Sequence, residues 1–296
     1  MGYELWTSPI TGYRRKGTRL AELRSLLGSG ITAHAILEPL QSCRADAVAT
    51  KMADILRRRD FDVAGVQSRP HGPVIGSVTR ESLKDGLVRD HIQPITADQL
   101  ISDATPLPSV LTVLKGRQHT FVLIGPEVRG IVARADLNKP PVRVYLFGLI
   151  SLLEMHLGFW VRAAYAEDSW QQKLTAKRLA AARGLQADRR KRNQDVSLVE
   201  CLQFCDKRDL VLAREDLRAS LCLGTKAHAL GRLKRAEDLR NLLAHSQQHL
   251  VKGSSWEELI GLVEWVETVV HTSDQQVEQA ARNSAERGED GLWASA

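Results

Sequence analysis

The sequence predicts an α+β protein with a β-rich N-terminal half and an all-helical C-terminal half. Short apolar runs bounded by turn residues, which are typical of strands, fall before residue 139. Paired prolines, Pro140 and Pro141, then mark a boundary, because proline stops a preceding element and restricts the residue before it. Beyond the prolines, apolar residues recur at helical spacing for roughly 130 residues, and strand signals disappear.

Length and composition indicate a soluble globular protein. The 296 residues suffice for about two domains. A hydrophobic fraction of 43% with 26% charged residues excludes a disordered chain. The net charge of +6 suits an anionic ligand or a nucleic acid without establishing either. Four cysteines form no CxxC pair, and we interpret Cys201 and Cys205 as small buried residues on one helical face.

One apolar stretch, residues 144–161, is long enough to raise the question of a membrane helix. It carries Glu154 and His156 in its C-terminal half. A charge near the centre of a membrane helix costs roughly 2.5–3.5 kcal/mol, so we expect a buried helix of a soluble bundle. Residues 1–13 contain no continuous apolar run, and no signal peptide is predicted. We therefore expect a cytoplasmic protein with no membrane partner.

The N-terminal half opens with a lead-in, residues 1–30. Residues 1–17 have mixed character, and leucines at helical spacing predict a short helix over 18–27 that the following glycines end. A pattern of helix and strands then occurs twice, which indicates two units that bury their faces against each other. The first copy is predicted as a helix over 46–59, strands over 62–66 and 74–78, and a helix starting at Arg80. The second copy is predicted as a helical stretch near 109–114, strands over 120–124 and 128–133 with a turn at 125–126, and a short ending at 136–137.

The two copies end in similar motifs. Residues 76–83 read GSVTRESL, and residues 130–137 read GIVARADL. Both resemble the signature that closes a CBS module, in which a strand beginning with Gly is followed by Ser or Thr and, three residues later, by Asp. The resemblance covers residues 31–139 and implies a CBS pair.

CBS modules work in pairs, and many pairs bind adenosine-type nucleotides in the cleft between them. The resemblance therefore implies an adenine nucleotide as a regulatory ligand. A carboxylate at a helix start can accept hydrogen bonds from ribose hydroxyls, while hydroxyls and guanidinium groups can hold phosphates. The predicted nucleotide-binding residues are Thr79, Arg80, Arg134 and Asp136.

Each copy departs from the CBS motif at one position. The first keeps Thr79 but has Ser82 where Asp is expected, and the second keeps Asp136 but has Ala133 where Ser or Thr is expected. At most one standard ribose-binding carboxylate therefore remains. The alternative is that the pair is structural, or a platform for dimerisation, and binds no ligand.

The C-terminal half is predicted as an all-α bundle, residues 142–272, followed by a flexible polar tail, residues 273–296. A break is expected at 206–209. The expected helices cover 142–166, 169–183, 196–204, 210–221, 226–249 and 256–270. A basic run follows the second helix. It either contacts an RNA backbone or forms a solvated surface, and consists of Arg189, Arg190, Lys191 and Arg192.

The hexapeptide 240–245 places Arg240, Asn241 and His245 in the penultimate helix. Asn241 and His245 share a face, whereas Arg240 and His245 lie about 140° apart on an ideal helix. Arg240 and His245 meet at one phosphate only if the helix bends or ends there, or if a second copy contributes. A two-fold dimer would present both residues from each subunit to a shared cleft.

The pattern Arg240-Asn241-x-x-x-His245, in a bundle of four or five helices, resembles the signature of the HEPN superfamily. The resemblance covers residues 142–272. HEPN proteins are small helical bundles that dimerise and place paired Arg and His residues in a cleft, and many are metal-independent endoribonucleases. Others serve as binding or antitoxin-like partners, so a non-catalytic bundle held by an Arg240 salt bridge is the alternative.

The implied chemistry matches these residue types. RNA cleavage can proceed by attack of the 2′-hydroxyl on the adjacent phosphate, with His245 moving the proton. Arg240 would stabilise charge on the phosphate oxygens, and Asn241 would orient His245. This scheme requires no metal or other cofactor. His245 and His249 lie four residues apart but have no third metal ligand nearby and no Glu next to the first His.

The sequence thus predicts a metal-independent, HEPN-type endoribonuclease that acts as a homodimer on single-stranded RNA. A CBS pair would regulate or dimerise it, with a role in toxicity or defence and an antitoxin or other regulatory protein as a further partner. The alternative function is a non-catalytic module for nucleotide sensing or protein interaction.

Overall fold

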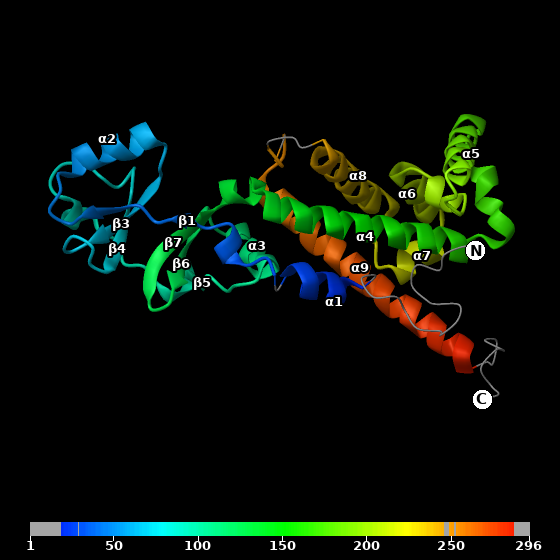
Figure 1. Ribbon diagram of the computed structural model, residues 1–296, viewed down its shortest axis with the longest axis horizontal. Coiled ribbons are helices and arrows are strands. Elements are labelled where there is room, and N and C mark those ends of the chain that lie inside the picture. Colours follow the sequence, from blue (N-terminus) through cyan, green and yellow to red (C-terminus); the bar gives the residue numbers. More distant parts are fainter. Residues whose placement is uncertain (1–18, 29, 246–248, 252, 287–296) are drawn as a thin grey trace. The chain divides into compact units, whose positions relative to one another are not determined.

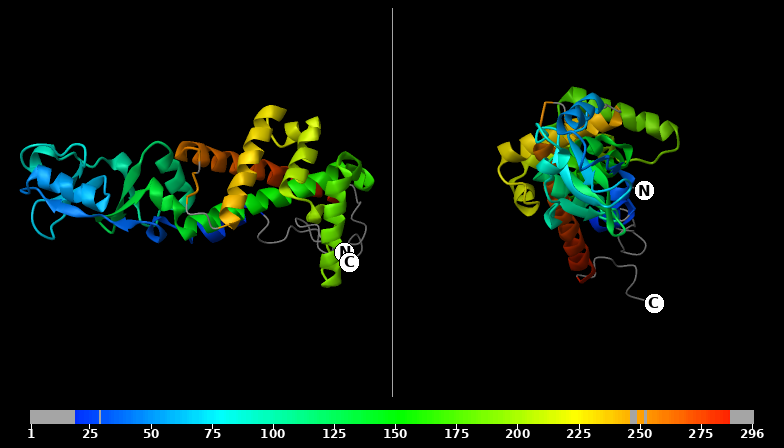
Figure 2. Two further views of the ribbon diagram at one scale, coloured as in Figure 1. Left: turned by 90° about the horizontal axis from the view of Figure 1, so that it is seen from above. Right: turned by 90° about the vertical axis from the view of Figure 1, so that its left-hand side faces the viewer.

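The chain forms two compact units. The computed structural model describes residues 19–28, 30–245, 249–251 and 253–286 (Figures 1 and 2). The β/α unit is Gly28–Val142, and the helical unit comprises Arg143–Ala296 together with Met1–Leu27. The predicted α+β fold class, with a β/α half followed by an all-helical half, is confirmed.

The β/α unit consists of two modules with the same order of elements, β-α-β-β. The first module comprises β2 (Ser42–Arg44), α2 (Ala49–Arg59), β3 (Val63–Gln67) and β4 (Val74–Thr79). The second comprises β5 (Leu100–Ser102), α3 (Leu107–Lys115), β6 (His119–Ile124) and β7 (Glu127–Ala133). In each module the first two strands pair in parallel across the helix, and the last two pair antiparallel. Register shifts occur at matching places, between Val66 and Gln67 and between Val122 and Leu123.

Each sheet is extended by a segment from outside its own module. β1 (Glu38–Pro39) precedes the first module but pairs antiparallel with β7 of the second. Gln93 lies between the modules and bridges to Ser77 of β4, with N···O distances of 2.8 and 2.9 Å. The segments on either side of the first module therefore pair with strands of both modules, β1 with β7 and Gln93 with β4.

The glycine that opens each motif lies under these added segments. A side chain at Gly76 would meet Ile92 and approach the Gln93 carbonyl oxygen to 2.7 Å. A side chain at Gly130 would lie 3.1 Å from the Val122 Cβ atom. Glycine therefore allows the close approach of the Gln93 backbone at Gly76, and of the Val122 and Leu37 side chains at Gly130.

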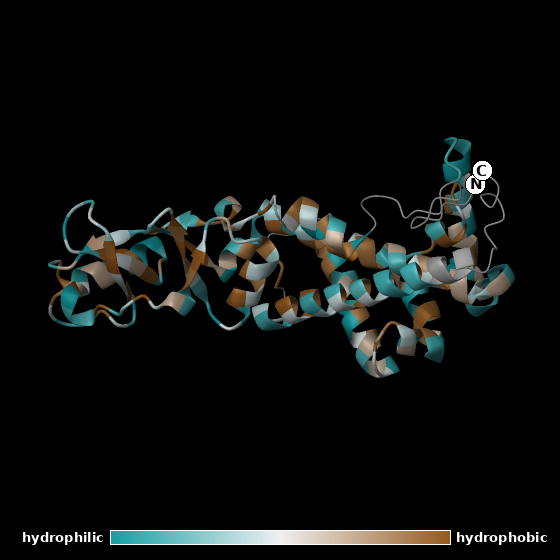
Figure 3. Ribbon diagram, turned by 90° about the horizontal axis from the view of Figure 1, so that it is seen from below, coloured by the Kyte–Doolittle hydropathy of each residue, from teal (hydrophilic) through white to brown (hydrophobic). Residues whose placement is uncertain are grey.

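The apolar faces of the strands pack against the helices of their modules. Figure 3 shows hydrophobic residues concentrated on the strands. Buried residues of the first module are Ala49, Ala53, Leu56, Ala64, Val66, Val78, Leu83 and Val88. Buried residues of the second are Leu107, Val110, Leu111, Leu114, Phe121, Val122, Val132 and Leu137.

The helix predicted to start at Arg80 does not form. Ser82 donates its backbone N–H to the Thr79 hydroxyl, and the Ser82 hydroxyl accepts from the Thr79 N–H, each over 3.1 Å. These short-range bonds favour a turn over a helix. The next helical residues are the 3-10 turn Val88–His91.

The helical unit gathers around two long helices that cross each other, α4 and α9 (Figures 1 and 2). α4 begins at Pro140, consistent with the tolerance of proline in a first helical turn. The helices are α1 (Leu20–Leu23), α4 (Pro140–Ala164), α5 (Ala176–Lys191), α6 (Phe204–Ala213), α7 (Glu215–Ser220), α8 (Lys226–Ala244) and α9 (Trp256–Glu286).

Buried polar contacts tie α4 to α9. The Ser273 hydroxyl lies 2.5 Å from Nδ1 of His156 and accepts from the Trp160 indole over 2.6 Å. Nε2 of His156 lies 3.3 Å from an Asp274 carboxylate oxygen. The other Asp274 oxygen accepts from the Leu20 backbone N–H over 2.8 Å, which anchors α1. The lead-in helix thus belongs to the helical unit.

Within the described ranges, one helix is long and apolar enough to cross a membrane by length and composition: α4. Of its most apolar window, 56% is buried. Leu146, Leu149 and Leu153 are at most 1% exposed, so α4 behaves as the core helix that the sequence predicts.

Several helix boundaries differ from the prediction. α5 runs to Lys191 instead of ending near residue 183, and α6 continues through the predicted break at 206–209. α8 ends at Ala244 instead of residue 249. α9 continues to Glu286, past the predicted start of the tail at 273, because Ser273 and Val277 still face the core.

Candidate functional site

The Arg240–His245 segment lies at the C-terminal end of α8. The Thr225 hydroxyl caps the start of α8 by accepting from the His228 N–H over 3.3 Å. At the other end, His245 is the first residue beyond the helix, and its N–H bonds to the Asn241 carbonyl over 3.1 Å. Asn241 and His245 are exposed, and Arg240 is half-buried. The helix therefore ends between Arg240 and His245, which was one of the conditions for the two side chains to meet.

Arg240 faces α4. Its Nε atom lies 3.6 Å from Oε2 of Glu154, and Nη1 lies 3.4 Å from the Asn241 side-chain oxygen. No hydrogen bond joins the side chains of Arg240 and His245 in the part of the chain that is described. The structure brings Arg240 and Asn241 together, while His245 follows on the exposed helix end.

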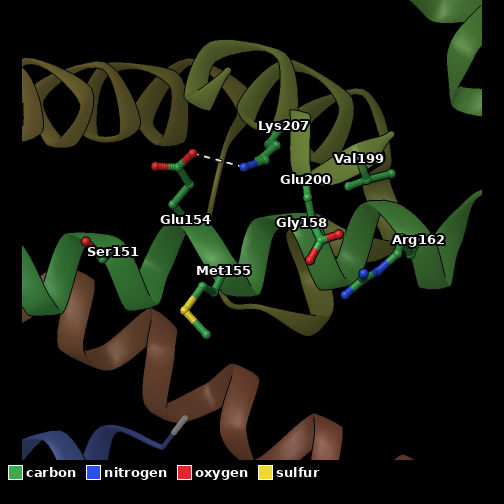
Figure 4. Close-up of a pocket in the computed structure, with 8 residues that line it drawn as sticks. All are labelled: Ser151, Glu154, Met155, Gly158, Arg162, Val199, Glu200 and Lys207. Atoms are coloured by element: carbon green, nitrogen blue, oxygen red, sulfur yellow. Dashed lines mark hydrogen bonds and ion pairs between the residues drawn. The ribbon is translucent and has the colours of Figure 1, made fainter. Parts of the chain in front are cut away.

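Glu154 also holds a second cation. Its Oε1 atom accepts from Nζ of Lys207 on α6 over 2.9 Å (Figure 4). The Lys207 side chain is only 9% exposed and that of Glu154 19%. A charge as buried as that of Lys207 requires a partner, and the same carboxylate is also the counterion of Arg240 on α8.

A cavity of about 300 Å³ opens beside this cluster (Figure 4). Its lining is mixed, with two carboxylates, two cations, a hydroxyl and apolar groups. The lining residues are Ser151, Glu154, Met155, Gly158, Arg162, Val199, Glu200 and Lys207. Gly158 forms part of the wall in mid-helix, where glycine costs about 1 kcal/mol relative to alanine. A Cβ atom there would lie 3.8 Å from both the Lys207 Cε and Val199 Cγ1 atoms, so an alanine would fit.

α6 carries further buried charges. Arg208 donates to Glu237 of α8 over 2.7 Å and to Asp209 over 2.8 Å. Asp206 pairs with Arg178 of α5. Lys207 and its neighbours thus join α6 to three other helices. Sequence reasoning missed this role by treating 206–209 as a break. The available signal was a charged run enclosed by apolar residues on both sides, from Phe204 to Leu212.

The basic run lies at the end of α5, a largely hydrophilic helix (Figure 3). Arg190, Lys191 and Arg192 are exposed, and Arg189 is half-buried. Lys191 pairs with Asp188 over 3.2 Å. Cations in a last turn also interact favourably with the helix dipole, so this position is explained without RNA. RNA binding by the run stays a prediction.

The predicted nucleotide-binding residues lie at the ends of β4 and β7, two strands that pack against each other. Asp136 is part of a 3-10 turn after β7, and its Oδ2 atom accepts from the Ala133 N–H over 2.8 Å. Its Oδ1 atom pairs with Nζ of Lys139 over 2.9 Å. Lys139 also donates to the Ile36 carbonyl and to Glu38, each over 2.5 Å. Burial lowers the pKa of Lys139, but its bonds to Glu38 and Asp136 outweigh this and raise the pKa above its ordinary value.

The first module has the same turn with a different side chain. The Ser82 hydroxyl accepts from the Thr79 N–H as Asp136 accepts from that of Ala133. Arg80 pairs with Asp62 over 2.8 Å and approaches Asp60 to 3.9 Å. The acceptor three residues after the strand therefore has a structural role in both modules.

Arg134 points into the protein. It is 7% exposed, and its guanidinium donates to the carbonyls of Leu114 and Lys115, over 2.9 and 2.8 Å. These carbonyls end α3 and lack partners within the helix. Arg134 is thus committed to capping α3, which argues against a role in holding phosphate.

No group of three or more His, Cys, Asp or Glu side chains suited to a metal ion occurs among the residues that can be described. His245 and His249 lie on either side of residues 246–248, which are outside them.

Comparison with known proteins gives structural matches alone. No family model matches the sequence. No curated protein matches it either. Among solved structures, the CBS-pair protein CBSX2 from Arabidopsis thaliana is 16% identical with a TM-score of 0.32, covering 39% of this chain and 94% of its own. The CBS domain of a bacterial CNNM/CorC family Mg²⁺ transporter in complex with ATP is 14% identical with a TM-score of 0.33, covering 40% of this chain and 91% of its own.

A third structure is the CBS domain pair of protein MJ0100 in complex with 5′-methylthioadenosine and S-adenosyl-L-methionine. It is 16% identical with a TM-score of 0.32, covering 36% of this chain and 96% of its own. Because these TM-scores are low, the description of the fold rests on the chain's own strand order and register. On that basis the N-terminal part is a pair of β-α-β-β modules, and the rest is an all-helical unit.

Proposed function

We propose that the protein is a nucleotide-sensing module in which the β/α unit binds an adenine nucleotide. The observation that carries this proposal is the position of Asp136. Its carboxylate follows β7 in a fixed turn, in the motif position whose resemblance implies a ribose contact.

The Asp136 side chain is 12% exposed, and its contacts leave some of its lone-pair sites unused. An ionised carboxylate has about four lone-pair sites, and the contacts with Ala133 and Lys139 use two of them. The remaining sites can accept two ribose hydroxyls. The Ala133 bond fixes the carboxylate beforehand, which lowers the entropy lost on binding. Ser82 offers no carboxylate at the matching position, so the proposal assigns one such site to each chain.

Ligand titration of the full chain tests this function. The first ligands are ATP and S-adenosyl-L-methionine, which the similar CBS structures contain. We expect at least one adenine compound to raise the melting temperature, and Asp136→Ser to abolish the shift. Serine preserves the turn, as Ser82 does natively, but removes the carboxylate. Ser82→Ala is the matched control, which weakens a turn and keeps the carboxylate. An unchanged melting temperature with every adenine compound would refute the proposal.

A second candidate function is RNA cleavage by the helical unit. The specific observation in its favour is that α8 ends at Ala244, so that Arg240, Asn241 and the exposed His245 lie together at the end of one helix. In this candidate, Arg240 holds a phosphate, His245 transfers the proton and Asn241 orients His245. A homodimer would supply a second set of the same residues, and Arg189 to Arg192 would contact the RNA backbone.

Metal-free cleavage of single-stranded RNA tests the second candidate. We expect the wild-type chain to cut RNA in the presence of a chelator and His245→Ala to lose at least about 100-fold in rate, the usual contribution of acid–base catalysis. His249→Ala is the matched control, because His249 is also an exposed histidine and has no role in the scheme. Equal rates for His245→Ala and the wild type would show that any cleavage does not depend on His245.

A further inference from the structure

The carboxylate of Glu154 lies where two cations converge. Lys207 reaches one of its oxygens over 2.9 Å, and Arg240 approaches the other to 3.6 Å. The two cations come from different helices, α6 and α8, and Glu154 comes from a third, α4. Each cation contacts a different oxygen, so both point at the same small group from different directions.

A phosphate group binds the same kinds of side chain as this carboxylate. It presents two or more negatively charged oxygens on one centre, and Lys and Arg are the side chains that bind such oxygens. The Lys207 side chain is only 9% exposed, so water screens its charge little. An anion that replaced Glu154 would therefore find both cations already in place.

A cavity of about 300 Å³ lies next to the cluster and is lined by Glu154, Lys207 and the Ser151 hydroxyl. The Glu200 carboxylate and Arg162 also line it, whereas Arg240 is not among the lining residues and approaches Glu154 alone. Gly158, which follows Glu154 by four residues on α4, keeps the neighbouring wall of the cavity free of a side chain.

We infer that Lys207 and Arg240 form a phosphate-binding site and that Glu154 occupies it as an internal substitute for the phosphate. In the present arrangement Glu154 offsets part of the positive charge of the site. This inference deepens the RNA-cleavage proposal, on which it rests for the source of the phosphate: it adds Lys207 to the residues that hold the RNA, and Glu154 as the group that restrains them.

Phosphate binding by Glu154→Gln tests the inference without RNA. Glutamine keeps the size of the side chain but removes the competing charge. At about ten times the dissociation constant, inorganic phosphate should raise the melting temperature of the full-length variant by about 3–6 °C relative to chloride at equal ionic strength. The wild type should shift much less at the same concentration. Lys207→Gln in the Glu154→Gln background should remove the shift.

Glu237→Gln is the matched control. Glu237 lies on α8 and pairs over 2.7 Å with Arg208, which is on α6 next to Lys207. The Glu237 side chain is 23% exposed, close to the 19% of Glu154, but it does not line the cavity. It should respond to phosphate as the wild type does. If Glu154→Gln does not fold, Glu154→Asp replaces it, because the shorter carboxylate cannot reach both cations and should give an intermediate phosphate shift.

Equal phosphate shifts in the wild type, Glu154→Gln and Glu237→Gln would overturn the inference. The outcome is separable from that of the cleavage assay. A selective shift in Glu154→Gln with no RNA cleavage by any variant would retain the phosphate site and reject the nuclease. Cleavage that depends on His245 but with no selective shift would retain the nuclease and reject the role of Glu154.

Discussion

At the scale of single residues, the partner of a buried polar side chain decides what that side chain can do. Arg134 and Lys207 are both basic and both nearly buried, yet they have different partners. Arg134 bonds to neutral carbonyls at a helix end, whereas Lys207 bonds to a carboxylate beside a cavity. An anion can compete for Lys207 by replacing Glu154, but it has no comparable access to Arg134. Net charge and sequence position alone do not distinguish the two.

His119 shows burial acting on a titrating group. Burial lowers the pKa of its imidazole, Arg117 lowers it further, and Asp62 partly opposes both. Its ring packs edge-to-face against Phe121, with centroids 5.3 Å apart. The folded pKa therefore lies below the unfolded value of about 6.5. Above that pH both states are neutral, and below it the unfolded chain binds the proton first, so stability falls as the pH falls.

We therefore predict that His119→Phe makes the free energy of unfolding of the β/α unit less dependent on pH between 7.5 and about 5. Phenylalanine keeps the ring and removes the titrating group. Urea unfolding at several pH values measures this directly. An identical decline with acid in both proteins would show that His119 does not contribute.

At the scale of elements, the sequence predicts which helices and strands form better than it predicts the residues at which they begin and end. The strands β3, β4, β6 and β7 lie within about one residue of their predicted ranges, since apolar runs between turn residues define them. β1 and β2 are too short to produce a pattern, and they form because partner strands provide hydrogen bonds. α6 was missed because its charges are paired with other helices, which no local pattern reveals.

The sequence likewise predicts only part of the candidate site. The sequence identified Arg240, Asn241 and His245 from their spacing, and Asp136 from its motif. It could not identify Glu154 as the partner of Arg240, because the two residues are far apart in the chain and meet only through the packing of α4 and α8. A charge inside an apolar helix signals that a partner exists but does not name it.

α4 offers a test of packing with two glycines. Gly158→Ala should stabilise the helical unit by about 0.5–1 kcal/mol, because alanine is the better helix former and its Cβ meets only ordinary contacts at 3.8 Å. Gly148→Ala should gain less or destabilise, since its Cβ would lie 3.1 Å from Leu23 Cδ1 and displace it. Chemical denaturation compares the two. Equal gains would contradict the packing of Leu23 on α4.

At the scale of the whole molecule, two units of different construction suggest two tasks. The β/α unit holds one carboxylate in a motif position, in the turn that follows β7. The helical unit holds a cluster of cations around one internal carboxylate. The proposals place nucleotide binding in the former and phosphate or RNA chemistry in the latter.

The central claim, that the chain senses an adenine nucleotide through Asp136, is tested most directly by calorimetric titration of the full-length protein. The account predicts one adenine nucleotide bound per chain, and a dissociation constant at least about tenfold weaker in Asp136→Ser, which corresponds to about 1.4 kcal/mol. Ser82→Ala should bind as the wild type does. Equal affinity in the wild type and Asp136→Ser, or no heat with any adenine nucleotide, would contradict the claim.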